Sequence, residues 1–181
     1  MLSAIPNLIT ALRFILVIPI SIYIYQENYF LALVLFIIAG ISDGIDGYLA
    51  RRFNWTSDFG QFADPLADKC LILATLLALA FSERLPLWFV YTMLTRDGII
   101  LVGSMMYLLL FDNNQALPNR WGKHYTGWTI ALFIIVLVNS SFNFLPEVFE
   151  WLSMLGVLIF IVLSLSSYFN QEGRDIFKKI I

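Results

Sequence analysis

The chain has 181 residues, of which 60% are hydrophobic and 13% are charged, and its formal net charge at pH 7 is −2. Soluble domains carry about 25% charged residues, so this composition and a mean hydropathy of +0.80 predict an integral membrane protein. The small negative charge gives no reason to expect nucleic-acid binding, and the single Cys70 excludes an internal disulfide framework.

Six apolar runs are long enough to form spanning helices, because a hydrocarbon core about 30 Å thick needs roughly 20 helical residues. They cover residues 7–26, 29–51, 58–82, 86–111, 122–142 and 148–170. We expect the first run to be a retained span, since it has neither a basic leader nor a convincing cleavage site. The sequence therefore predicts an all-α bundle of six transmembrane helices, forming one domain over residues 1–181 with short interfacial segments at both ends.

The distribution of basic residues gives the orientation of these spans. Lysine and arginine gather on one side of a six-span arrangement, at Arg51, Arg52, Arg120, Lys123, Arg174, Lys178 and Lys179. The opposite loops hold Arg84 among several glutamates. The positive-inside rule then places both termini in the cytosol, in a multi-pass protein of the inner or cell membrane.

Four aspartates interrupt the second and third runs, namely Asp43, Asp46, Asp64 and Asp68. An ionised carboxylate at membrane depth costs several kcal/mol unless a partner neutralises it, so such residues are functional candidates. Spacings of three and four residues put the acids of each run on neighbouring stripes of a helix. If the two helices pair as an antiparallel hairpin, we expect the acids to converge just inside the cytosolic boundary.

An all-oxygen cluster of this kind predicts a divalent cation. Mg²⁺ and Mn²⁺ suit such ligands, Ca²⁺ is an alternative, and the lack of His or Cys in the motif argues against zinc. Two ions about 3.5–4 Å apart are a common device for phosphoryl transfer. Three of the acids suffice as shared ligands, and the deeper Asp68 is placed to take a proton from an attacking alcohol. Arg51 and Lys69 are positioned to contact phosphates or to balance the acids.

Other interpretations of these residues remain open at this point. Intramembrane acids also mark ion pathways, so a divalent-cation transporter is an alternative, although the acids cluster on one side of the membrane. Acids used only for helix pairing would not require glycines at fixed offsets. Lys69 has the alternative role of counter-ion to Asp64 or Asp68, and His124 is interpreted as an interfacial residue.

The residues from Asp43 to Asp68 fit the pattern D-x2-D-G-x2-A-R-x8-G-x3-D-x3-D at every defined position. This resembles the signature of the CDP-alcohol phosphatidyltransferases. The segment from Pro6 to Thr10, with Arg13, is similar to the first helix of that family. The resemblance implies a six-helix membrane enzyme, commonly a homodimer, with a polar cavity open to the cytosol. It further implies transfer of a phosphatidyl group from CDP-diacylglycerol to an alcohol, with release of CMP.

The same resemblance implies roles for individual residues. It implies that Asp43, Asp46, Asp64 and Asp68 bind Mg²⁺ or Mn²⁺, with two ions expected. Asp68 is also implied to be the catalytic base. The residues implied to bind CDP-diacylglycerol are Asn7, Asp43, Gly47, Ala50, Arg51, Gly60 and Lys69.

Two acceptors fit different parts of the sequence. The loop 118–123 and the ending 173–178 are similar to bacterial phosphatidylglycerophosphate synthases, whose acceptor is sn-glycerol 3-phosphate. Its phosphate needs a basic pocket, for which the candidates are Arg96, Arg120 and Lys123. The segment 85–88 and the pair Arg96-Asp97 look more like the cardiolipin synthases of the family, whose acceptor is phosphatidylglycerol.

Overall fold

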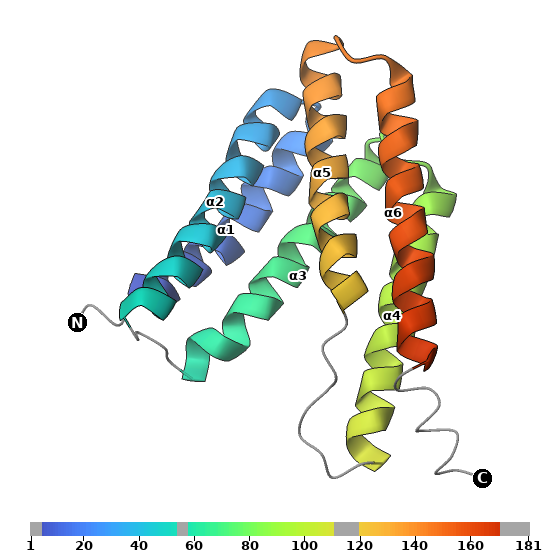
Figure 1. The fold of residues 1–181 in the computed structure, drawn as a ribbon. Coiled ribbons are helices and arrows are strands. Elements are labelled where there is room, and N and C mark those ends of the chain that lie inside the picture. The colour runs from blue at the N-terminus through green and yellow to red at the C-terminus, as the bar shows by residue number, and fades with distance from the viewer. Residues whose placement is uncertain (1–4, 54–57, 111–119, 171–181) are drawn as a thin grey trace. The chain divides into compact units, whose positions relative to one another are not determined.

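A computed structural model describes residues 5–53, 58–110 and 120–170, with side chains described at 10–44, 52, 63–107, 109 and 120–170. All regular structure in these residues is helical. The helices are α1 (Ile5–Tyr25), α2 (Tyr29–Phe53), α3 (Asp58–Phe81), α4 (Leu87–Leu110), α5 (Arg120–Phe142) and α6 (Glu147–Tyr168) (Figure 1). Each helix falls on one of the six predicted apolar runs, with ends that differ by a residue or two. The predicted all-α fold class is therefore confirmed.

Left-handed residues follow α1, α3 and α5, and the first two lie in tight turns. Glu27 follows α1 with φ 58°, and Glu83 follows α3 with φ 57°. After α3, the Glu83 amide donates to the Ala80 carbonyl at 3.1 Å and the Arg84 amide donates to the Leu79 carbonyl at 2.9 Å. This pair of bonds satisfies carbonyls that a helix end otherwise leaves unpaired. The equivalent turn after α1 makes α1 and α2 antiparallel neighbours.

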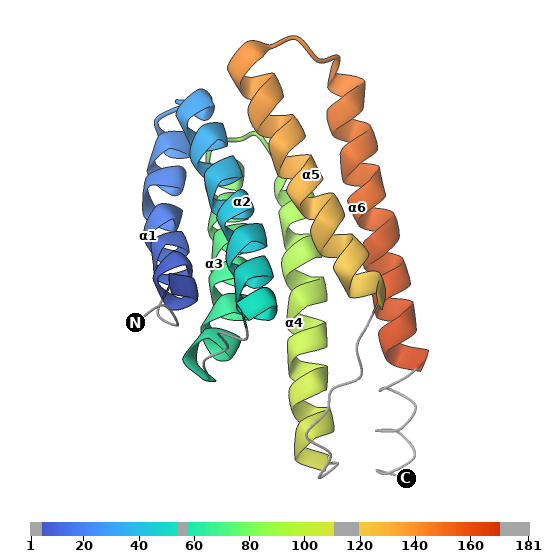
Figure 2. The same cartoon turned by 60° about the vertical axis from the view of Figure 1, so that its left-hand side comes forward.

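The chain divides into two compact units, and the first contains the acidic helices. It joins the chain up to Leu85 with Val136–Phe144. Within this unit α1 packs against both α2 and α3 (Figures 1 and 2). The side chains that α1 buries in these contacts include Arg13 as well as Ile20 and Ile24. The central helix of the unit is therefore α1.

Polar contacts fix the first unit at the end of the helices that is remote from the aspartates. The Ser82 hydroxyl donates to the Ile24 carbonyl at 3.1 Å, which ties the end of α3 to the end of α1. Arg84 Nε donates to the Tyr29 hydroxyl at 3.1 Å, and the guanidinium lies 4.7 Å from the centre of the Tyr29 ring. These contacts hold α1, α2 and α3 in register, which fixes the direction in which their other ends present the acids.

The second unit joins Pro86–Ile135 with the chain from Leu145 onward. In it α4 packs against α6, and Gly103 of α4 gives space to the Tyr168 side chain of α6. Between α5 and α6, Trp128 stacks on Phe160 at 5.9 Å between ring centres and also covers Gly156. Small residues therefore allow large aromatic side chains to fill this unit.

The helices differ in how clearly they suit a membrane. By length and composition, α5 and α6 are long and apolar enough to cross one, and Thr10–Tyr25 of α1 and Tyr29–Gly44 of α2, where the side chains are described, are also apolar. Among the described residues there are thus two clear candidate spans in an all-helical protein, and six spans stay a prediction.

Candidate active site

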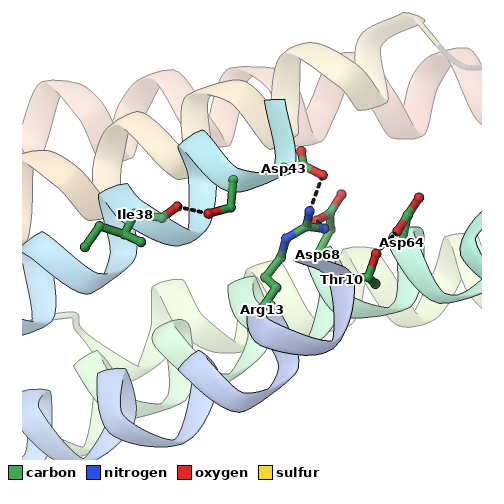
Figure 3. Close-up of polar contacts among 7 residues, drawn as sticks. Thr10, Arg13, Ile38, Asp43, Asp64 and Asp68 are labelled. Carbon is green, nitrogen blue, oxygen red and sulfur yellow. Dashed lines mark hydrogen bonds and ion pairs between the residues drawn. The ribbon is translucent and has the colours of Figure 1, made fainter. Parts of the chain in front are cut away.

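Two polar side chains of α1 lie on the face that α2 and α3 cover. Thr10 and Arg13 are three residues apart, and therefore on one side of the helix, and each is 1% exposed. A buried guanidinium is costly unless carboxylates neutralise it. Figure 3 shows both side chains directed at aspartates of the neighbouring helices. The polar face of α1 thus selects which acids of α2 and α3 come together.

Arg13 joins α2 to α3 through two ion pairs. Its Nη2 lies 2.8 Å from Oδ1 of Asp43, and its Nη1 donates a hydrogen bond of 2.5 Å to Oδ1 of Asp68 (Figure 3). The Arg13 side chain has no exposed surface, whereas those of Asp43 and Asp68 keep 46% and 42%. The Arg13 guanidinium therefore lies buried beneath the Asp43 and Asp68 carboxylates, and part of each carboxylate stays accessible to solvent.

Asp64 lies one turn from Asp68 on α3 and has a separate partner. The Thr10 hydroxyl donates a hydrogen bond of 2.5 Å to Asp64 Oδ1. Asp64 and Asp68 thus both face α1, as their four-residue spacing predicts. From the sequence, the acids of α2 and α3 were expected to meet if those two helices paired directly as an antiparallel hairpin. In the described residues they meet instead through Thr10 and Arg13 of α1.

The donor atoms of this group suit a divalent cation. Asp43 and Asp68 share the buried Arg13 guanidinium, and Asp64, one turn away on α3, accepts a hydrogen bond from Thr10. Oxygen donors and negative charge, which Mg²⁺ and Mn²⁺ prefer, are therefore both available. Among the residues with described side chains, however, no group of three or more His, Cys, Asp or Glu lies close enough to hold one ion. The carboxylates therefore suit a divalent cation in charge and donor type, while hydrogen bonds to Arg13 and Thr10 set their positions.

Several predicted site residues lie outside the described side chains. They are Asn7, Asp46, Gly47, Ala50, Arg51 and Gly60. Gly44, another small residue of α2, has no atom within 4 Å of the position of an added Cβ, so it faces open space rather than a packed helix. Lys69 is exposed on α3. The counter-charge to Asp43 and Asp68 comes from Arg13.

Sequence reasoning gave no role to Thr10 or Arg13, which it quoted only for their resemblance to a family's first helix. A signal was present, because Arg13 is the single charged residue in the α1 sequence. A lone charge within an apolar helix indicates a nearby partner of opposite sign. The acid-rich helices that follow in the chain supply that partner twice.

Arg96, a predicted acceptor residue, belongs to a polar cluster inside the second unit. It is 8% exposed, its Nη1 donates to Asp97 at 2.8 Å, and its Nη2 donates to the Ser164 hydroxyl on α6. The guanidinium carbon lies 4.1 Å from the centre of the Tyr125 ring on α5. Arg96 therefore connects α4, α5 and α6, and a role in binding the acceptor stays a prediction.

The other two predicted acceptor residues begin α5 in the same unit. Arg120 and Lys123 are both exposed. His124 beside them is also exposed and stacks on Phe160, with ring centres 5.7 Å apart and planes at 24°. The interpretation of His124 as an interfacial residue stays a prediction.

Comparison with known proteins matches the Asp43–Asp68 motif to a family. The family model of the CDP-alcohol phosphatidyltransferases matches residues 3–163. A CDP-diacylglycerol–glycerol-3-phosphate 3-phosphatidyltransferase of Bacillus subtilis (strain 168) is 34% identical over 141 residues, which cover 77% of this chain and 72% of that protein. A protein of the same name from Aquifex aeolicus (strain VF5) is 31% identical over 179 residues, covering 97% of this chain and 99% of the relative.

A relative with a different name also matches. A cardiolipin synthase (CMP-forming) of Streptomyces coelicolor is 36% identical over 125 residues, or 66% of this chain and 57% of that protein. The resemblance recognised from the sequence is therefore confirmed. The two names correspond to the two acceptors that the sequence left open.

Proposed function

This chain belongs to the CDP-alcohol phosphatidyltransferase family, and from that premise we propose that it transfers a phosphatidyl group from CDP-diacylglycerol to sn-glycerol 3-phosphate. The products are phosphatidylglycerophosphate and CMP. The observation that carries this proposal is the signature from Asp43 to Asp68, three of whose acids gather around α1. The choice of acceptor is supported by the name of a relative that matches 97% of the chain.

In the proposed reaction, the acceptor's hydroxyl oxygen forms a bond to the phosphorus atom that carries the diacylglycerol. The pyrophosphate bond at that phosphorus breaks, and CMP leaves with the electron pair. Asp68 takes the hydroxyl proton, and its partial exposure supports access by an acceptor. We assign metal binding to Asp43, Asp46, Asp64 and Asp68. Bound Mg²⁺ or Mn²⁺, with two ions proposed, neutralises phosphate oxygens and stabilises the charge of the leaving group.

The remaining residues of the signature hold the donor in this proposal. Small residues let the backbone approach the nucleotide closely, and basic side chains contact the phosphates. The open space at Gly44 supports an approach to α2 from that side. The residues assigned to donor binding are Asn7, Asp43, Gly47, Ala50, Arg51, Gly60 and Lys69.

The second candidate is cardiolipin synthesis, with phosphatidylglycerol as the acceptor. The Streptomyces coelicolor relative favours it by name and has 36% identity over the matched part. The exposed cations Arg120 and Lys123 favour a small phosphorylated acceptor instead, because they offer charge that a phosphate monoester needs. We therefore retain these two residues, with Arg96, as the proposed acceptor site.

The proposal extends to the setting of the enzyme. Six spans, cytosolic termini, an active site open to the cytosol and a homodimer are proposed from the pattern of apolar and basic residues and from the resemblance. Two clear candidate spans support the membrane setting. Both units are proposed to act as one domain, since the family match from residue 3 to residue 163 runs through both.

A side-by-side acceptor assay tests the proposed function. Purified protein in mixed micelles receives CDP-diacylglycerol and Mn²⁺ or Mg²⁺, and the acceptors are sn-glycerol 3-phosphate, phosphatidylglycerol, inositol phosphate and serine. We expect CMP release with sn-glycerol 3-phosphate, at least about tenfold above the others. Release with phosphatidylglycerol alone would establish the second candidate. Release with none of the four would refute the acceptor assignment.

A further inference from the structure

Arg13 holds the two carboxylates that a shared cation would need. Each of its terminal nitrogens contacts a different acid, Asp43 on α2 and Asp68 on α3, at 2.8 and 2.5 Å. The two acids come from helices that are both packed against α1. The guanidinium thus already supplies positive charge at the point where the helices present negative charge.

The positions of the described acids favour an exchange of cations. Asp43 and Asp68 each meet the guanidinium through Oδ1, an oxygen that a metal ion would also use as a ligand. Mg²⁺ requires oxygen ligands at about 2.0–2.1 Å, so a Mg²⁺ ion that takes these two oxygens as ligands competes with the guanidinium that already binds them. The present positions of the carboxylates are those that hydrogen bonds to Arg13 and Thr10 enforce.

We propose that Arg13 is a positioning residue that serves as the resident counter-cation of the active site. It holds Asp43 and Asp68 together while no divalent cation is bound, and it gives up both carboxylates when one binds. This inference rests on the metal site proposed above. Its physical basis is that two partly buried carboxylates, on two helices packed against α1, repel each other unless a cation lies between them.

Competition between Arg13 and a divalent cation predicts the direction in which the cation affinity changes when Arg13 is replaced. If Arg13 must release its acids, its removal makes binding of a divalent cation tighter. If Arg13 instead preorganises the acids for the metal and remains bound, its removal makes binding weaker. The direction of the change in Mn²⁺ affinity therefore separates the two roles without any measurement of catalysis.

The first experiment measures Mn²⁺ binding to purified full-length protein without substrate, from the electron paramagnetic resonance signal of free Mn²⁺. We expect Arg13→Met to bind Mn²⁺ at least roughly tenfold more tightly than wild type, since a charge-assisted hydrogen bond no longer competes. Arg13→Lys should lie between them. Arg84→Met, the same change at the remote end of the unit, should bind like wild type.

The outcomes of this experiment are separable. Equal or weaker binding by Arg13→Met, with wild type binding Mn²⁺, would overturn the inference alone. No binding by any variant would overturn the proposed metal site, and with it the release of the carboxylates by Arg13.

The second experiment measures the counter-cation role in EDTA. We expect Arg13→Met to lower the melting temperature by roughly 10 °C, because two carboxylates lose their counter-charge. Combining it with Asp43→Asn and Asp68→Asn should recover most of that loss. If Arg13→Met proves too unstable to purify, Arg13→Lys, which keeps the charge, should still fold and melt below wild type, and an unchanged melting temperature in Arg13→Lys would overturn the counter-cation role. No loss in Arg13→Met, or no recovery in the combined variant, would overturn the counter-cation role.

Discussion

At Gly103 of α4, the space for a side chain is already filled by Tyr168 of α6. A Cβ added there would lie 1.9 Å from the Tyr168 hydroxyl oxygen, 2.6 Å from Cζ and 3.0 Å from Cε1. Ordinary van der Waals contact lies at 3.4–4 Å, so Gly103→Ala obliges the ring to move by more than an ångström. Tyr168 is 6% exposed, and the movement therefore disturbs buried packing.

Gly98 on the same helix provides a matched control. An added Cβ at Gly98 meets no atom within 4 Å, so Gly98→Ala brings only the helix propensity of alanine, about 1 kcal/mol. Gly103→Ala brings the same gain and an overpacking cost of about 1–3 kcal/mol. The difference between the two variants isolates the overpacking. For a chain of this size it corresponds to roughly 2–12 °C in melting temperature.

Thermal unfolding of the purified proteins in detergent measures this difference. Gly98→Ala is expected to melt above wild type, and Gly103→Ala below Gly98→Ala by the stated margin. In a Tyr168→Ala background the ring is absent, so the penalty of Gly103→Ala should vanish. Equal melting temperatures of the two alanine variants would refute the assigned contact, as would a penalty that persists without Tyr168.

Other parts of the fold lead to further expected outcomes. Glu83→Gly should raise the melting temperature by about 2–4 °C, because its φ of 57° costs a residue with a Cβ roughly 1 kcal/mol, and a lower melting temperature would contradict this reasoning. Arg96→Ala should cost about 3–5 kcal/mol in unfolding free energy, since it leaves a carboxylate and the buried Ser164 hydroxyl without the guanidinium; a loss below 1 kcal/mol would disprove that structural role. Lys123→Ala, at an exposed position, should change stability by less than about 0.5 kcal/mol while raising the KM for sn-glycerol 3-phosphate, and an unchanged KM would remove it from the acceptor site.

The helices were predictable from the sequence because a membrane sets both the length and the polarity of what crosses it. Polar breaks such as Gln26–Asn28 end one run and start the next, and the structure places turns there. The spacing of Asp64 and Asp68 likewise gave their common face, since local helix geometry fixes it. Helix bounds and helix faces depend on residues that are close in the sequence, so they can be predicted from it.

The arrangement of the acids was not predictable in the same way. Whether α2 packs on α3 or both pack on α1 depends on contacts between distant residues, such as Arg13 and Asp68, which are 55 positions apart. Arg96 has a partner on α6 that could not be predicted either, because it too lies far away in the sequence. Its basic side chain indicated a binding role, whereas its partner Ser164 lies 68 positions away and could not be identified from spacing.

Metal-dependent release of CMP tests most directly whether the acids gathered by α1 perform the proposed transfer. Purified wild type, stripped with EDTA, is given CDP-diacylglycerol and sn-glycerol 3-phosphate, and CMP is measured while Mn²⁺ is added back. We predict no CMP before the addition, full release after it, and a rate at least about 100-fold lower in a folded Asp68→Asn variant. Undiminished release in EDTA, or wild-type rates in Asp68→Asn, would contradict the assignment of these carboxylates.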